Sequence, residues 1–148
     1  MVYESRVAAE HSLWRAPLEG AGAPVKLVDA GGSDLVVSPD SKLFAFRADT
    51  GEVEVRSLEN GELVRRMPAP ADPSALQWTA DGSAVLYLCH AAGEAQLWKQ
   101  PLAAGPPMRL QASLPNDVRS LDWSADRHRI VYLRRQIHVN LALITNLR

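Results

Sequence analysis

Histidine can bind metal ions and transfer protons near neutral pH, and the sequence contains His11, His90, His128 and His138. Two ligands that grip one metal from a single element are usually separated by only about two to five residues. No two of the histidines are that close, so we expect neither a zinc site nor any other cofactor. We predict that His11, His90 and His128 lie in connecting loops with solvated imidazoles.

Two glycine-containing segments have the composition of catalytic or cofactor-binding loops. Residues 31–35, Gly-Gly-Ser-Asp-Leu, share part of the serine nucleophile elbow but lack its closing glycine, so a loop is predicted. Residues 20–24, Gly-Ala-Gly-Ala-Pro, do not open a helix as a dinucleotide-binding loop would, and we predict a hairpin turn. No catalytic, cofactor-binding or metal-binding residue is therefore assigned, and the binding residues are unknown at this stage.

The charges are balanced, with 16 basic and 17 acidic side chains and a formal net charge of -1. Because phosphate neutralisation needs a basic face, direct nucleic-acid binding is not expected. The largest basic cluster is predicted to be solvated, with an acidic partner or a phosphate as the alternative; it comprises Arg127, Arg129, Arg134 and Arg135. An acidic stretch comprises Glu52, Glu54, Glu59 and Glu62. Strand alternation is expected to place Glu52 and Glu54 on one exposed side of a strand.

The single cysteine, Cys89, lies in the apolar run 85–89, where a thiol usually packs as a small hydrophobic group. No apolar stretch approaches the roughly 18 residues of a membrane span. Residues 1–6 do not resemble a secretory signal. The sequence as written fits the cytoplasm, and a periplasmic location is the alternative if an upstream segment is missing, so the compartment is unknown.

Three short sequence motifs, here called phrases, recur in the same order along the chain. They define the repeats in which the residues discussed above lie. The first is an aspartate turn followed by an apolar strand, at residues 38–46, 79–87 and 124–132, with aspartates Asp40, Asp81 and Asp126 that lie 41 and 45 residues apart. The second is Leu-Trp-x-x-Pro-Leu at 13–18 and 97–102, and the third is a short strand after a glycine-containing turn. Recurrence at about 40 residues is typical of propeller blades.

Each repeat is predicted to form four short antiparallel strands joined by tight turns. The Asp-Gly pair at 81–82 favours a hairpin, and Pro39 presets the backbone for a turn. A helix at residues 6–15 is the competing interpretation, since Val-Ala-Ala-Glu has helical propensity. We reject it because this stretch aligns with residues 91–94, which connect two strands of a later repeat.

Four tryptophans stand at repeated positions: Trp78 and Trp123 before their aspartate turns, and Trp14 and Trp98 in the second phrase. A binding site seldom needs the same residue in every copy. We therefore predict that these side chains pack between neighbouring blades, because a single blade cannot bury both of its faces.

The Ser-Pro-Asp and Trp-Ser-Ala-Asp phrases, together with the Leu-Trp-x-x-Pro-Leu strand, resemble the TolB-like, WD-repeat-like β-propellers of bacteria over nearly the whole chain. The tail, residues 139–148, is similar to the end of propellers attached C-terminally to bacterial winged-helix regulators and serine/threonine kinases. Arg127 stands where the pattern has glycine, and Asn140 where an acidic residue is usual. The resemblance implies structural motif residues and no catalytic positions.

The fold expected for residues 1–148 is therefore all-β: one partial β-propeller of about three and a half four-stranded antiparallel blades. The repeats are predicted at 1–30 (incomplete), 31–70, 71–113 and 114–148 (incomplete). Tyr3 aligns with Phe46, Tyr87 and Tyr132, so the chain is expected to start at the second strand of a blade and to end after a third strand. These ends are not complementary, which indicates a fragment or an open arc that self-associates through its blade faces.

The function expected from the sequence is a non-catalytic binding or scaffolding module, part of a larger bacterial regulatory or envelope protein. A protein partner is the first expectation, and a small ligand the second. The alternative is the propeller segment of a prolyl-oligopeptidase-type serine hydrolase whose catalytic domain is absent from this chain. An upstream winged-helix or kinase domain would favour the first function, and a downstream hydrolase domain the alternative.

Overall fold

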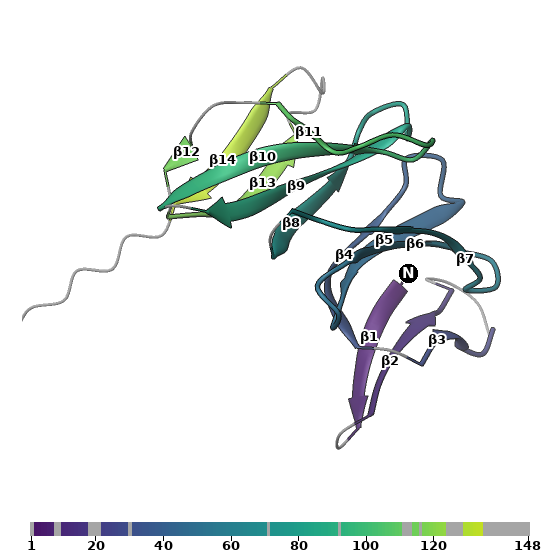
Figure 1. Ribbon diagram of the computed structural model, residues 1–148. Helices are drawn as coiled ribbons and strands as arrows, with labels where there is room; N and C mark the ends of the chain where they lie inside the picture. Colours follow the sequence, from purple (N-terminus) through teal and green to yellow (C-terminus); the bar gives the residue numbers. More distant parts are fainter. Residues whose placement is uncertain are drawn as a thin grey trace, which may run out of the picture.

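The computed structural model describes residues 2–7, 10–17, 22–29, 31–70, 72–91, 93–110, 114–115, 117–123 and 129–134. These residues form strands, turns and irregular segments, and none of them lies in a helix. The strands belong to four antiparallel sheets that succeed one another along the chain (Figure 1). We call the sheets blades 1 to 4 in chain order.

The strand order within each blade follows the order of the sequence. Blade 1 consists of β1 (Val2–Val7), β2 (Glu10–Arg15) and β3 (Val25–Val28). Blade 2 consists of β4 (Gly32–Val37), β5 (Leu43–Ala48), β6 (Val53–Ser57) and β7 (Leu63–Met67). Blade 3 consists of β8 (Pro73–Trp78), β9 (Ala84–Ala91), β10 (Glu94–Pro101), β11 (Met108–Arg109) and β12 (Leu114–Pro115), the last paired with the start of β10. Blade 4 consists of β13 (Val118–Trp123) and β14 (Ile130–Arg134).

This succession of antiparallel blades confirms the expected partial propeller. Blade 1 lacks the strand equivalent to β4 among the described residues, since β1, which carries Tyr3, matches β5 and β9. The start of the chain at a second strand stays a prediction. The predicted third strand of blade 4 falls on residues outside the described ones, and the exact repeat ranges stay predictions.

Strand β5 shows how one strand serves two interfaces, because successive side chains point to opposite faces of a sheet. Phe44, Phe46 and Ala48 are buried against Leu13 and Leu27 of blade 1. Ala45, the residue between the two phenylalanines, is buried in the cluster shared with blade 3. The mixed apolar pattern of the strand therefore reflects burial on both faces.

Strand β9 repeats this arrangement one blade later. Val85, Tyr87 and Cys89 are buried against blade 2, whereas Leu86 and Leu88 face blade 4. The predicted packing of Cys89 as a small hydrophobic group is confirmed, since its side chain is fully buried in this core. The stability of the fold comes from layers between blades, as expected for a repeat protein.

The β1–β2 and β9–β10 hairpins have matching ends. Val7 pairs with Glu10, and Ala91 pairs with Glu94, so the two segments aligned in the sequence close equivalent hairpins. The rejection of a helix is confirmed for residues 6–7 and 10–15, which belong to strands, while residues 8–9 lie outside the described ones. Pairing within the sheet outweighs the helical propensity of this stretch.

The inner strand β4 corrects one prediction. Residues 32–35 belong to β4 and not to a loop, and the pairing with β5 shifts register between Ser33 and Val36. The shift is a β-bulge, and a bulge accommodates residues that otherwise favour turns. Asp34 within it has a φ of 57°. Gly32 is required there, since a Cβ at this position would overlap the ring of Phe46.

The aspartate turns are held by local hydrogen bonds. The Asp40 carboxylate accepts bonds from the Ser38 hydroxyl (2.7 Å) and the Lys42 backbone N–H (3.1 Å). Asp81 accepts bonds from the Thr79 hydroxyl (2.7 Å) and the Ser83 N–H (3.0 Å). The turn at Asp126 lies outside the described residues.

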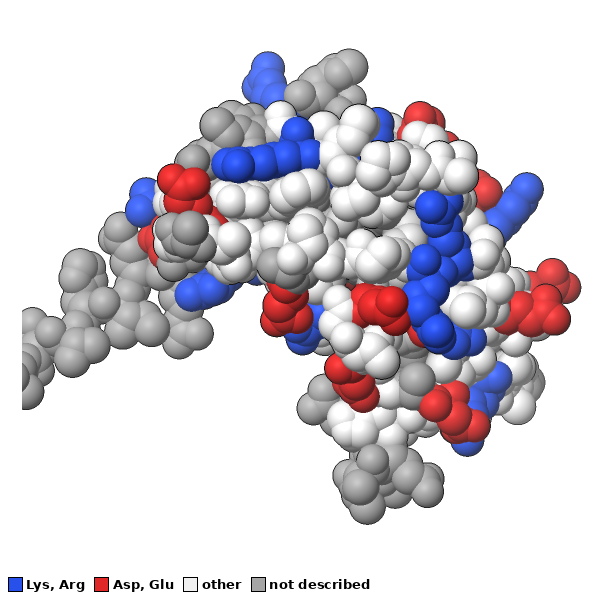
Figure 2. Space-filling model, in the orientation of Figure 1, with Lys and Arg blue, Asp and Glu red and all other residues white. Residues whose placement is uncertain are grey.

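Both signs of charge are interspersed on the face of the molecule seen in Figure 2, with broad uncharged areas between them. In the described part of the chain, no helix has the length and apolarity needed to cross a bilayer.

Candidate binding site between blades 1 and 2

The histidines in the described residues lie on strands and not in loops, which corrects the prediction. His11 is part of β2 and His90 is part of β9, because the hairpin pairing extends further than the sequence indicates. The Nε2 atom of His90 lies 3.1 Å from the carbonyl oxygen of Val118 in blade 4. His128 and His138 are outside the described residues, and no metal-binding group of three or more His, Cys, Asp or Glu occurs among the described ones.

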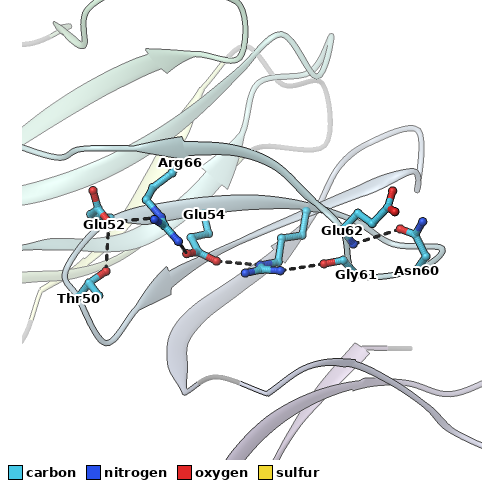
Figure 3. A network of polar contacts seen from close by, with 8 residues as sticks. Thr50, Glu52, Glu54, Asn60, Gly61, Glu62 and Arg66 are labelled. Carbon is cyan, nitrogen blue, oxygen red and sulfur yellow. Dashed lines mark hydrogen bonds and ion pairs between the residues drawn. The ribbon is translucent and has the colours of Figure 1, made fainter.

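Glu54 corrects a second prediction, because its side chain is buried and not exposed. Its carboxylate pairs with Arg56 Nε at 2.8 Å and with Arg66 Nη2 at 2.9 Å, and Arg66 also approaches Glu52 at 3.5 Å (Figure 3). Arg56 donates a further bond to the Gly61 carbonyl at 2.9 Å. The network ties β6, β7 and the turn between them together.

The pKa of Glu54 is lowered, although burial acts in the opposite direction. Removal of the carboxylate from water is the largest single influence and raises the pKa, but the hydrogen bonds and charges of Arg56 and Arg66 together outweigh it. Glu54 therefore remains ionised near neutral pH and is no candidate for a general acid.

The basic cluster is only partly described, by Arg129 and Arg134, since Arg127 and Arg135 lie outside the described residues. Arg134 Nε donates to both oxygens of Asp117, at 2.9 and 3.1 Å. This bond lowers the pKa of the Asp117 carboxyl and raises that of Arg134. Arg134 thus has an internal partner in its own blade.

A polar hollow of about 200 Å³ lies where the β5–β6 turn meets the segment before β8. Arg47 lines it and donates to the Ser33 hydroxyl at 2.9 Å and to the Asp72 carboxylate at 2.6 Å. Asp34 accepts the Ala75 backbone N–H at 3.0 Å and so joins the bulges of blades 2 and 3. The polar groups here satisfy one another, and the hollow is a structural link between blades.

A larger cleft of about 510 Å³ lies between blades 1 and 2, and we call it the Val37 cleft. Its apolar lining includes Val2, Pro17, Val25, Val37 and Leu58. Val25 and Val37 are 44% and 39% exposed, which is unusual for valines between two sheets. The cleft therefore presents apolar surface to the solvent at a place where neighbouring blades otherwise exclude water.

The cleft exists where the repeat departs from its own pattern. Val37 precedes its aspartate turn just as Trp78 precedes the next one, but Trp78 is 3% exposed and fills the interface between blades 2 and 3. Its indole Nε1 donates to the Val36 carbonyl at 3.2 Å. The smaller valine leaves open the space that the indole ring occupies one blade later.

Two polar side chains of the described part of the chain line the Val37 cleft, and both are hydrogen-bond donors. Arg15 stands in a cross-strand row between Val2 and Val25 and donates from Nη1 to the Leu58 carbonyl at 3.3 Å. The second is the hydroxyl group of Ser41, and no acidic side chain of the described residues lines the cleft. Apolar walls with a few convergent polar groups are typical of ligand-binding sites.

Comparison with known proteins gives a match in structure but not in sequence. No family model matches the chain, and no curated protein matches its sequence. TolB from Acinetobacter baumannii superposes with a TM-score of 0.69 over 91% of this chain, at 18% identity. The chain has a TolB-like β-propeller fold. It spans 35% of the length of that TolB chain.

Two further solved structures support the same fold. A protein of Listeria monocytogenes EGD-e matches with a TM-score of 0.62 over 90% of this chain and half of its own, at 8% identity. A prolyl endopeptidase matches with a TM-score of 0.61 over 89% of this chain and 26% of its own, at 16% identity. At such identities the likeness shows the fold alone, so the function has to be argued from the residues of this chain.

The packing predicted for the tryptophans holds for the TolB-like blades 2 and 3. Trp78 is part of their shared core, and Trp98 packs against it. Trp14 differs, since it is only half-buried, donates to the Ser12 hydroxyl at 2.8 Å and lies 5.6 Å below the Lys26 ammonium. The side chain of Trp123 is outside the described part.

The Val37 cleft was missed in the sequence, although a signal for it is present. Valine at position 37 interrupts the tryptophan pattern of Trp78 and Trp123, and an interruption in a repeat marks a place where packing is not conserved between copies. Arg15 gives no such signal, because only the folded structure places it beside Val37.

Proposed function

We propose that this chain is a non-catalytic binding module whose stacked blades hold the Val37 cleft as the recognition site for a partner protein. The observation that carries this proposal is the exposed apolar lining of the cleft around one guanidinium group. The rigid blades on both sides would keep the site preformed, which lowers the entropic cost of binding.

The fate of the other polar groups supports a binding role over catalysis. The described carboxylates with lowered pKa values are engaged with neighbouring side chains or turn amides, as for Glu54, Asp81 and Asp117. Their hydrogen bonds hold turns and strands together. The proposal extends to the whole protein: a larger bacterial regulatory or envelope protein of which this chain forms a C-terminal part.

Selection of short random peptides, displayed on phage with free carboxyl termini, against the purified chain tests this function. We expect enriched peptides whose synthetic forms bind in titration calorimetry, and we expect Val37→Trp to remove that binding because the indole fills the cleft. Val64→Trp is the matched control, since Val64 is 52% exposed on β7 and does not line the cleft. Failure to enrich any peptide, or equal binding by Val37→Trp, would refute the proposed site.

A second candidate function is the propeller segment of a prolyl-oligopeptidase-type hydrolase, which the likeness to a prolyl endopeptidase favours. The gene on either side of this segment distinguishes the two. An upstream winged-helix or kinase domain supports the binding module, whereas a hydrolase domain encoded downstream supports the second candidate.

A further inference from the structure

We propose that the Val37 cleft binds the carboxyl-terminal residue of a partner polypeptide, with its apolar side chain against Val25 and Val37 and its carboxylate against Arg15. This inference rests on the proposed function and names the part of the partner that is recognised.

The donors at the cleft point to an anionic group that only accepts hydrogen bonds. A guanidinium has five N–H donors, and Arg15 uses one of them on the Leu58 carbonyl. Arg15 pairs with no carboxylate among the described residues, and Ser41 adds a hydroxyl to the lining. A carboxylate matches the planar fork of arginine and can accept two parallel bonds.

The interface between blades 2 and 3 can be compared with the one that holds Arg15, between blades 1 and 2. There Arg65 donates to the carbonyl of Leu102, which holds the place in blade 3 that Leu58 holds in blade 2. Trp78 lies in the core of that interface and fills space beside the arginine's blade. Between blades 1 and 2 the corresponding bond runs from Arg15 to the Leu58 carbonyl. Arg15 lies on the third strand of the repeat, β2, whereas Arg65 lies on the fourth, β7, and the open space beside Arg15 is the Val37 cleft.

A peptide terminus fits this site better than a free fatty acid, which shares the apolar body and the carboxylate. Leu58 lines the cleft, and its carbonyl oxygen has a second lone pair beyond the one that Arg15 uses. The backbone N–H groups of a peptide can donate to this acceptor, whereas a fatty acid has no such donor.

Fluorescence polarisation with a labelled peptide that ends in Ala-Leu tests the inference on the wild-type chain. We expect the peptide with a free carboxylate to bind, and the same peptide with a C-terminal amide to bind about tenfold more weakly or not at all, because the charge-assisted bonds are lost. Arg15→Gln should reduce affinity for the free acid by a similar factor and leave the weak affinity for the amide unchanged. Arg119→Gln, which alters an exposed arginine outside the cleft, is the control.

Other outcomes separate this inference from the proposed function. If selected peptides bind in the Val37 cleft with equal affinity as free acid and as amide, the binding module stands and the carboxylate inference is overturned. If decanoate binds and the free-acid peptide does not, the ligand is a fatty acid and the inference fails. Comparison of the two peptide forms on the wild-type chain needs no variant, so a folding defect in a variant cannot mask the result.

Discussion

The indole Nε1 of Trp78 donates a hydrogen bond to the carbonyl oxygen of Val36, 3.2 Å away, and so joins the inner strands of blades 2 and 3. The ring itself lies in the core that these blades share. One residue thus combines apolar burial with a polar link to the neighbouring blade. In blade 2 the corresponding residue, Val37, has no side-chain donor and is 39% exposed.

Trp78→Val should copy the situation of Val37 into the next interface and destabilise the chain. We expect a loss of about 3 kcal/mol in the free energy of unfolding, because the substitution opens a cavity and leaves the Val36 carbonyl without its donor. Urea denaturation followed by circular dichroism measures the change. Trp14→Val, at a half-buried position outside the interblade cores, should cost less than half as much, and equal losses would contradict this account.

Glu54→Gln tests the buried ion network of blade 2. Two guanidinium groups lose their shared counter-ion, and we expect the free energy of unfolding at neutral pH to fall by about 2 kcal/mol. The value lies below that of a fully buried pair because Arg66 is half-exposed. Glu62→Gln, on the adjacent turn, should change it by no more than about 0.5 kcal/mol.

The loss of stability in Glu54→Gln should depend on pH. Because the folded state lowers the pKa of Glu54 below its ordinary value of 4.5, the carboxylate stabilises the fold above that pH. The contribution disappears as the pH falls through the lowered pKa. The difference between wild type and Glu54→Gln should therefore be full at neutral pH and shrink progressively below pH 4.5, and a constant difference would show that Glu54 is not ionised in the fold.

Tyr87 should be the last tyrosine to ionise. Burial raises its pKa to about 12, with a smaller effect of Cys89, and its hydroxyl is buried without a hydrogen-bond partner. Tyr87→Phe should therefore leave stability at neutral pH unchanged or raised by up to about 1 kcal/mol. A near-ultraviolet titration of tyrosinate should show a late phase that this variant lacks.

Alkaline unfolding checks the sign of that pKa shift. A raised pKa means that the folded state favours the neutral phenol, so this contribution is complete below pH 10 and is lost as the pH rises through about 12. Wild type should lose stability in this window relative to Tyr87→Phe. Parallel losses in both proteins would mean that Tyr87 is accessible to solvent.

Asp81 should set the strength of the turn between β8 and β9. Bonds from the Ser83 backbone and from the Thr79 and Ser83 hydroxyls hold the pKa of its carboxyl far below the usual range. Asp81→Ala removes every acceptor and should lower the thermal midpoint, whereas Asp81→Asn retains one oxygen and should lower it less. Equal midpoints for the three proteins in differential scanning calorimetry would refute this role.

Apolar side chains on β14 predict self-association of the isolated chain. Val131 and Leu133 are 62% and 64% exposed and lie on the same side of the strand, since they are two residues apart. We expect size-exclusion chromatography with light scattering to show a mass that rises with concentration. Val131→Lys combined with Leu133→Lys should shift the chain toward a monomer, and a wild type that stays monomeric at every concentration would contradict the prediction.

The repeat pattern alone predicted the blades, because each strand and turn is specified by local chemistry. The aspartate turns, the paired hairpin ends at Val7 and Ala91, and the burial of Cys89 all follow from residues that are close in sequence. The prediction that His11 and His90 lie in loops was wrong, since the length of a hairpin depends on pairing across the sheet and not on the composition of its end.

By itself the sequence determined a partial propeller of four-stranded repeats with tryptophan between blades, since alternation and turn residues act over short distances. Only the tertiary structure decided which blade covers each face. It buried Glu54 between two arginines and brought Arg15 beside Val37. The physical reason is that a strand pattern fixes the side on which a residue points, whereas burial, pKa and open space depend on what the neighbouring blade places against it.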